Sequence, residues 1–108
     1  MNVVKNDGMY KTARISGPKH NYLALALSAI TPIEVKIRPR ITHGCETSDI
    51  DESKLLAAVN EGVEDGNRDT GRTLSIDCIE YVPTDTPDYK VYKELARAII
   101  QSASQDFG

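Results

Sequence analysis

The sequence is poor in the residues that usually mark metal sites, disulfide frameworks and aromatic binding surfaces. Its 108 residues include no tryptophan, one phenylalanine, two histidines and two cysteines. Cys45 and Cys78 are too few for a disulfide framework, and they indicate reduced thiols in a cytoplasmic protein. No apolar run approaches the roughly 20 residues of a membrane helix, and the N-terminus lacks a signal-peptide core. We therefore expect a cytoplasmic chain that has no membrane partner.

Motifs for catalysis and cofactor binding are also missing. Neither glycine-rich phosphate loop, G-x-G-x-x-G or G-x-x-x-x-G-K-[ST], occurs in the sequence. His43 and Cys45 are the only nucleophile-like pair, and two loop residues in solvent are the simpler interpretation of both. A zinc site would need two more ligands, at Cys-x-x-Cys or His-x-x-x-His spacing. We expect no catalytic residue, no metal and no cofactor; an enzyme that uses Cys45 with His43 is the alternative.

Charge is distributed unevenly along the chain. The formal net charge is −3. Residues 1–43 contain seven Lys/Arg and two Asp/Glu, whereas residues 44–108 contain six and fourteen. Such asymmetry is typical of one basic surface on an acidic body. The composition, 40% hydrophobic and 27% charged, is that of one globular domain.

Hydrophobic periodicity predicts four strands and two helices. Period-two alternation marks strands at 9–16, 22–29, 33–40 and 74–82, and three-to-four spacing marks helices at 51–66 and 87–104. The predicted fold is an α+β two-layer sandwich, with one mostly antiparallel four-stranded sheet, two helices on one face and the order β-β-β-α-β-α. The predicted parts are an N-terminal segment at 1–8, a single domain at 9–104 and a C-terminal tail at 105–108.

Local features refine this prediction. Gly66 is part of a helix stop signal, and Gly62 marks either close packing or an earlier end of the helix. The residues of the last strand that alternate toward the core are Leu74, Ile76 and Cys78. Ile79 and Tyr81 have the opposite parity, so we expect a bulge or burial on both faces of that strand.

The sheet face away from the helices is predicted to be mixed in character. Its residues are Tyr22, Ala24, Ala26, Glu34, Lys36, Arg38 and Asp77, with Tyr81 as a further candidate. Together with Arg40, the two cations of this face form a one-sided basic ladder, which is how proteins grip phosphates without reading sequence. An ordinary exposed strand has the same pattern, so the ladder fits both interpretations.

The second half of the chain resembles a known family. In the run LLAAVNEGVEDGNRDTGRTLSIDCIEYVPTDTPDYKVYKELARAIIQSA, a helix core A-V-x-x-G-[IV] is formed by Ala58, Val59, Gly62 and Val63. This core resembles that of domain IV of translation elongation factor G, and SGPKHNYLALALSAITP is similar in layout to the first loop and strand of that domain. The resemblance covers residues 16–104 and implies the fold that this family shares with the second domain of ribosomal protein S-five.

The resemblance also implies a working tip. In the family, two loops at one end of the domain enter the ribosomal decoding region, and they correspond here to residues 16–21 and 83–88. The first loop has one glycine where the family has several, and the second lacks the family's histidine. The tip residues implied by the resemblance are Lys19 and His20 in the first loop and Thr84, Asp85 and Thr86 in the second.

Two functions are expected from these features. The first is a non-catalytic module that binds the ribosome or RNA through the tip loops and through Lys19, His20, Lys36, Arg38 and Arg40. One phenylalanine and no tryptophan leave little for stacking on single-stranded bases, which counts against base reading. The second is a protein-interaction or regulatory module, including a homodimer through the open sheet face, with Tyr22 and Tyr81 at its centre.

Overall fold

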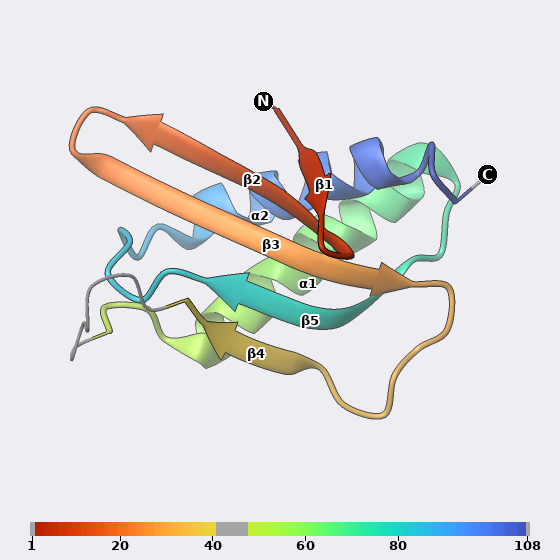
Figure 1. Ribbon diagram of the computed structural model, residues 1–108, viewed down its shortest axis with the longest axis horizontal. Coiled ribbons are helices and arrows are strands. Elements are labelled where there is room, and N and C mark those ends of the chain that lie inside the picture. The colour runs from red at the N-terminus through yellow and green to blue at the C-terminus, as the bar shows by residue number, and fades with distance from the viewer. Residues whose placement is uncertain (1, 41–47, 108) are drawn as a thin grey trace.

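The computed structural model describes residues 2–40 and 48–107. Their elements are β1 (Val4–Asn6), β2 (Met9–Ser16), β3 (Lys19–Ser28), β4 (Lys36–Pro39), α1 (Glu52–Thr70), β5 (Ser75–Tyr81) and α2 (Tyr89–Ala103). The strands form one sheet in the order β1-β2-β3-β5-β4, and both helices cover the same face of it (Figure 1). The predicted α+β class is confirmed. The sheet has five strands rather than four, and it is mixed because β4 runs parallel to β5.

The additional strand lies in what was predicted to be an N-terminal segment. β1 and β2 form a hairpin whose two turn residues, Asp7 and Gly8, have φ values of 53° and 75°. Positive φ at both positions defines the turn type whose twist matches that of paired strands. The Asp7-Gly8 turn therefore makes residues 4–6 a strand that pairs with β2, so the segment at 1–8 is part of the sheet.

The next hairpin is longer and forms one end of the molecule. β2 occupies residues 9–16, as predicted, and β3 begins at Lys19, so the turn consists of Gly17 and Pro18 alone. Gly17 has a φ of 61°, which an L-residue with a side chain rarely adopts. The predicted loop at 16–21 is thus mostly the end of a β-hairpin.

β4 is shorter than the predicted strand at 33–40. Only four residues pair with β5, and Ile33, which has the parity opposite to Glu34 in the predicted strand, is fully exposed. Parallel neighbours need a long crossover connection. α1 provides it with 19 residues, and Asp51 caps this helix by accepting from the backbone N–H groups of Ser53 and Lys54.

Two glycines of α1 allow it to lie close to α2. A Cβ atom added at Gly62 would overlap the carbonyl oxygen of Lys93 and lie 2.8 Å from the Cβ atom of Ala96. At Gly66 it would lie 2.6 Å from the Cβ atom of Ile100. Close packing at Gly62 is confirmed. The helix stop predicted at Gly66 is wrong, because that glycine is an internal contact and α1 ends only at Thr70, before Gly71.

β5 contains the expected bulge. Ala26 pairs with Cys78 and Leu27 with Ile76, so the chain of β5 has one extra residue, Asp77, between them. Because of the extra residue, the side chains after the bulge point to the face opposite to the one that strict alternation predicts. Ile76, Ile79 and Tyr81 are consequently all buried against the helices, whereas Cys78, predicted to face the core, is only half-buried.

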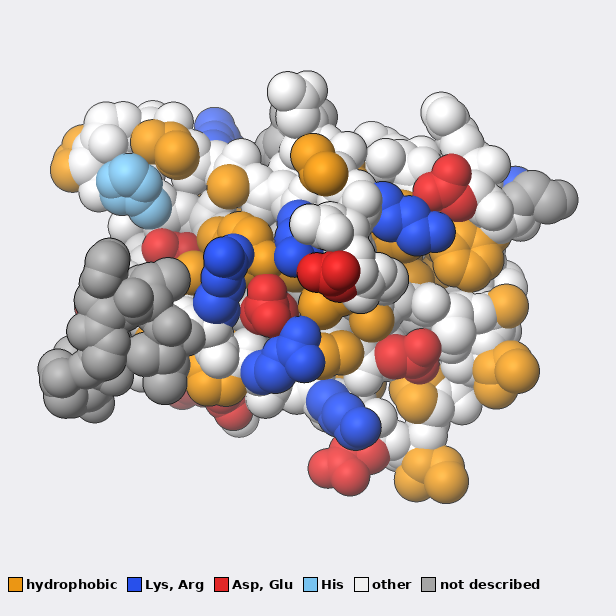
Figure 2. Space-filling view, in the orientation of Figure 1, with side chains coloured by type: hydrophobic (Ala, Val, Ile, Leu, Met, Phe, Trp, Pro, Cys, Tyr) orange, Lys and Arg blue, Asp and Glu red, His pale blue; other side chains and the backbone are white. Residues whose placement is uncertain are grey.

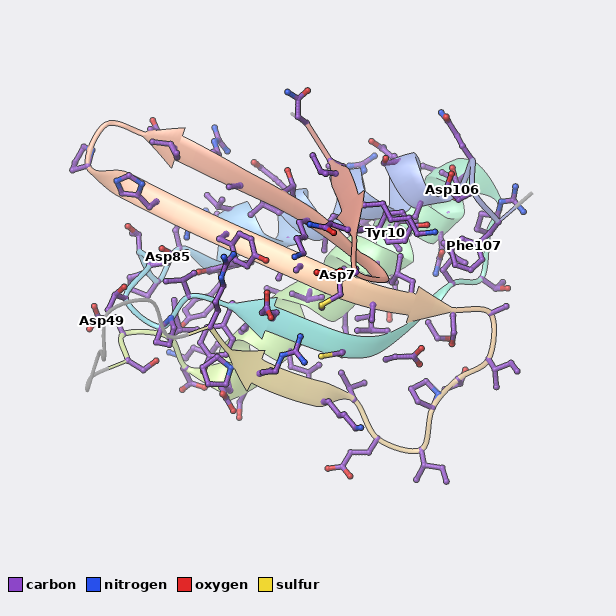
Figure 3. All side chains as sticks on the ribbon, in the orientation of Figure 1. Asp7, Tyr10, Asp49, Asp85, Asp106 and Phe107 are labelled. Carbon is purple, nitrogen blue, oxygen red and sulfur yellow. The ribbon has the colours of Figure 1, made fainter. Side chains whose placement is uncertain are left out.

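The C-terminal tail is packed rather than free over its described part. The Tyr10 hydroxyl donates to Asp106 Oδ2 at 2.9 Å, and the two side chains meet beside the end of α2 (Figure 3). Phe107 packs against the core, and its carbonyl oxygen accepts from Arg72 at 2.6 Å. Neither described helix is long and apolar enough to cross a membrane.

Candidate nucleic-acid interface

The two predicted tip loops lie against each other at one end of the molecule. The backbone N–H of Thr86 donates to the carbonyl oxygen of His20 at 3.1 Å. The Asn21 side-chain amide donates to the Thr86 carbonyl oxygen at 2.7 Å, and the backbone N–H of Tyr22 donates to Asp85 Oδ2 at 2.8 Å. Three hydrogen bonds therefore join the start of β3 to the loop between β5 and α2, and we call this joined end the tip (Figure 1).

A buried polar cluster supports the tip from inside. Asp85 and Asn21 are 8% and 3% exposed, and Figure 3 shows Asp85 in the loop beside the β2–β3 hairpin. Burial raises the pKa of Asp85, although the Tyr22 N–H and the nearby His20 oppose this shift. The Tyr92 hydroxyl is fully buried close to these groups and has no hydrogen-bond partner among the described residues. Its burial raises the pKa of Tyr92 to about 12.

This burial changes the role expected for the second tip loop. Of its three predicted contact residues, only Thr84 is exposed, whereas Thr86 is half-buried and Asp85 is buried. Asp85 therefore holds the loop in place and does not present its carboxylate to a partner. The exposed basic residues of the tip are Lys19 and His20, both at the start of β3.

A groove adjoins the tip on the side of α2. It has a volume of about 290 Å³ and is lined by Arg14, Ser16, Lys19, Asn21, Asp88, Lys90, Val91 and Glu94. Two of its charges neutralise each other, because Arg14 Nη1 lies 2.7 Å from Glu94 Oε2. Lys19 and Lys90 remain beside Asp88, so this groove is close to neutral and only weakly attractive to an anion.

The open sheet face carries the predicted basic ladder. Strand register aligns Arg38 of β4 with Glu80 of β5, Ala24 of β3 and Lys11 of β2. Lys36 and Arg40 occupy the flanking positions of the same β4 edge, and all three ladder residues are exposed. Figure 2 shows Lys and Arg side chains on this face, over the sheet that is in front in Figure 1, with Asp and Glu side chains between them.

Glu80 is the centre of a hydrogen-bond network on that face. It accepts from the Tyr22 hydroxyl at 2.8 Å and from Arg38 Nη2 at 3.0 Å. Burial alone would raise the pKa of Glu80, but the bonds from Tyr22 and Arg38 outweigh it and hold the pKa below its usual value. Arg38 also contacts Met9 Sδ at 3.4 Å, and the Arg40 guanidinium lies 5.3 Å from the centre of the Tyr22 ring.

The structure separates the two tyrosines that were predicted to form one contact surface. Tyr22 lies on the open face with the ladder. Tyr81 is 3% exposed on the helix side, where its hydroxyl donates to Glu52 Oε2 at 2.5 Å. The bulge in β5 is the reason, because it places Tyr81 and Ile76 on the same face. The homodimer centre predicted from Tyr22 and Tyr81 together is therefore not present.

One residue of the basic face was missed in the sequence. Lys11 is half-buried beside Glu80 and helps to lower the pKa of that carboxylate. Lys11 has the same parity as Ala13 in the predicted strand at 9–16, which places both on one face of that strand. The sequence does not show that this is also the face of the ladder, because that depends on the register that aligns β2 with β4 across two intervening strands.

The described residues contain no group of three or more His, Cys, Asp or Glu side chains that could hold a metal ion. His43 and Cys45, the pair considered for an enzyme or half of a metal site, lie outside the described residues. No protein-family model matches the chain, and no curated protein or solved structure is significantly similar to it. The resemblance to domain IV of elongation factor G stays a prediction.

Proposed function

We propose that the chain is a non-catalytic, cytoplasmic module that binds RNA, free or in the ribosome, through its open sheet face and tip. The observation that carries this proposal is the placement of Lys36, Arg38 and Arg40 on one exposed edge of the uncovered face. Lys19 and His20 add two exposed basic side chains at the tip. This partner agrees with the resemblance, in which the corresponding tip meets ribosomal RNA.

Charge is separated between the two layers in a way that suits an anionic partner. The acidic surplus lies in the helix layer, where α1 contains Glu52, Glu61, Glu64, Asp65 and Asp69. An RNA approaching the sheet face therefore meets cations without first meeting that acidic surface. Steering of this kind raises association rates and weakens as salt is added.

The face is suited to phosphate contacts rather than to base reading. Ala24 at the centre of the sheet is completely buried, because larger side chains meet around it, including Arg38, which reaches Met9 Sδ. Tyr22 is the one aromatic ring of this face, and the Arg40 guanidinium already lies over that ring. Because phosphate contacts position a ligand without specifying its sequence, binding is expected to depend little on base composition.

A homodimer formed face to face through the open sheet is less compatible with this geometry. It would take the exposed charges of Lys36 and Arg40 out of water on both copies, and burying a charge that lacks a partner is costly. Tyr81, the second aromatic residue of that hypothesis, lies on the helix side. An anionic partner neutralises the ladder, whereas a second identical face does not.

The test is sedimentation with ribosomes, ribosomal subunits and a short single-stranded RNA at two salt concentrations. Lys36→Gln with Arg40→Gln removes two charges from the face, and Lys19→Gln with His20→Gln changes the tip. Lys54→Gln with Lys93→Gln is the matched control on the helix layer. For each phosphate of single-stranded RNA that a variant no longer neutralises, the slope of log affinity against log salt should fall by about 0.7.

The outcomes separate clearly. A loss of binding confined to the face and tip variants supports the proposal. Equal weakening by the control variant would show that only net charge matters, and absence of binding to ribosomes and RNA at low salt would overturn the proposal.

A further inference from the structure

The two edges of the sheet differ in how well they are protected against adding another strand. β4 forms one edge, and it is only four residues long, with exposed Lys36 and Arg38 and a terminal Pro39 that has no N–H to donate. Short length, charge and proline are the usual features that prevent strand addition. The opposite edge has none of them over part of its length.

β1 protects only the first part of the β2 edge. Its three residues pair with Met9, Tyr10 and Lys11. The Thr12 hydroxyl then donates to the Asn2 carbonyl oxygen at 2.7 Å, which is the last contact with the N-terminal segment. Beyond Thr12, no strand within residues 2–40 and 48–107 lies along the outer side of β2.

The register shows which backbone groups this leaves free. In an antiparallel hairpin, the residues next to a two-residue turn exchange hydrogen bonds, and every second pair repeats that exchange. Met9 and Lys11 therefore bond to β1, while Thr12 and Arg14 bond to β3. By the same alternation, the N–H and C=O groups of Ala13 and Ile15 point away from the sheet.

The side chains of this stretch offer no obstacle. Residues 13–16 are exposed, and Ile15, which is 70% exposed, shares the open face with Ala13. The stretch contains no proline, and its pairing with β3 is regular. Its one charged residue, Arg14, is held toward the helix layer by Glu94. An unprotected edge with an exposed isoleucine is a template for a further strand.

We propose that the occupant of this edge is a second copy of the chain, joined β2 to β2 in antiparallel orientation about a two-fold axis at Arg14. In this register Ala13 of each copy pairs with Ile15 of the other, and the free N–H and C=O groups of both residues become hydrogen-bonded. A register centred on Ala13 would need Lys11, which β1 already occupies, and one centred on Ile15 would need Gly17 of the turn. The free groups therefore favour one self-complementary register.

Side-chain chemistry agrees with that register on both faces of the sheet. On the open face, each Ile15 would cover Ala13 of the second copy, so exposed apolar surface is removed from water. On the helix side, the two Arg14 residues would meet at the axis, each already paired with its own Glu94 at 2.7 Å. The two guanidinium groups repel each other, and the Glu94 carboxylate beside each of them offsets that repulsion.

This dimer differs from one formed through the open face. A sheet continuous across both copies would keep all the helices on one side and leave both basic ladders exposed on the other. The dimer does not require RNA binding, because it depends on the β2 edge alone. If both proposals hold, the dimer presents two ladders to one RNA.

The experiment is sedimentation equilibrium over a wide concentration range, combined with amide hydrogen exchange. The chain has a mass of 11.9 kDa, and the proposal expects twice this mass at high concentration, with the Ala13 and Ile15 amides protected as the dimer forms. Ile15→Lys should keep the fold and remain monomeric. Ile33→Lys is the matched control, because Ile33 is fully exposed away from the β2 edge.

A charge exchange provides a second, independent variant. Arg14→Glu should weaken the dimer, and Arg14→Glu with Glu94→Arg should restore it. A wild-type chain that stays at 11.9 kDa at the highest concentration would overturn the proposal. An edge that binds a strand of another protein but not a second copy of this chain would also overturn it. A dimer that is unaffected by Ile15→Lys would overturn it as well.

Discussion

The backbone N–H of Tyr22 and the carboxylate of Asp85 form a 2.8 Å hydrogen bond between residues that are 63 positions apart in the chain. It joins the beginning of β3 to the loop that leads into α2. Asp85 is almost completely buried, so the loop is anchored by a side chain that solvent hardly reaches. The exposed groups of the tip are therefore presented on a supported backbone.

Replacing Asp85 should show how much this anchor contributes. Asp85→Ala leaves the Tyr22 N–H without its acceptor, and an unsatisfied buried donor costs about 1–3 kcal/mol. The free energy of unfolding, measured with urea, should fall by that amount. Thr84→Ala is the control, because its exposed side chain should change stability by no more than about 0.5 kcal/mol. Equal effects of the two substitutions would mean that the anchor is unimportant.

The same residue should produce a characteristic pH dependence. Burial raises the pKa of Asp85 above its ordinary value of 3.8, so the folded chain binds a proton that the unfolded chain has released. Stability from this group is therefore fully present below that ordinary value and is lost as pH rises through the folded pKa. Asp85→Asn keeps an acceptor for Tyr22 but cannot ionise. The variant should gain stability relative to the wild type as pH rises toward neutrality, and a constant difference would contradict this.

Close contact between α1 and α2 predicts an unusual response to a helix-favouring substitution. Alanine is normally preferred to glycine inside a helix by about 1 kcal/mol. At Gly62, however, the added Cβ atom would overlap the backbone of Lys93, and overpacking costs about 1–3 kcal/mol. We expect Gly62→Ala to lower the melting temperature, whereas Asn60→Ala on the exposed side of the same helix should not. A stabilised Gly62→Ala variant would show that the two helices separate easily.

Four tyrosines predict a loss of stability in alkali. Burial, with an added contribution from a nearby carboxylate at each, raises the pKa to about 12 for Tyr10, Tyr22, Tyr81 and Tyr92. Because the unfolded phenols ionise near their ordinary value of 10.0, the stabilisation is complete below that pH and is lost as pH rises toward 12. Phenolate absorbance and urea unfolding should report this together. Tyr10→Phe should make the decline shallower, and constant stability across the range would contradict the prediction.

Local patterns predicted much of the fold, and non-local pairing accounts for what was missed. The strand at 9–16, the bulge in β5 and the close packing of Gly62 depend on alternation or on neighbouring residues, and all three are confirmed. β1 consists of exposed residues, so it carries no apolar signal beyond the Asp7-Gly8 turn. The parallel pairing of β4 with β5 is set by the path of α1, which no short pattern contains.

The candidate site shows the same division. Exposure of Lys36, Arg38 and Arg40 follows from strand parity, which the sequence displays directly. Burial of Asp85 does not, because it depends on a partner in another hairpin. Gly66 was misassigned for a related reason. A glycine that ends a helix and a glycine that lets a second helix pack closely look alike in sequence. Only the position of Ile100 against Gly66 distinguishes the two roles.

The network around Glu80 leads to a last prediction about the proposed RNA face. Glu80 is the acidic group at the centre of the ladder, and its bond to Arg38 reduces the positive charge available to a phosphate. Glu80→Gln keeps an acceptor oxygen for one of the two donors, Tyr22 or Arg38, and removes the negative charge. Affinity for a short RNA should therefore rise by roughly threefold to tenfold, or about 1 kcal/mol, with a steeper dependence on salt. Glu64→Gln removes an equal charge from the exposed side of α1 and is the control. If both variants strengthened binding equally, net charge alone would explain the effect; if Glu80→Gln weakened binding, Arg38 would need its carboxylate partner to be held in position.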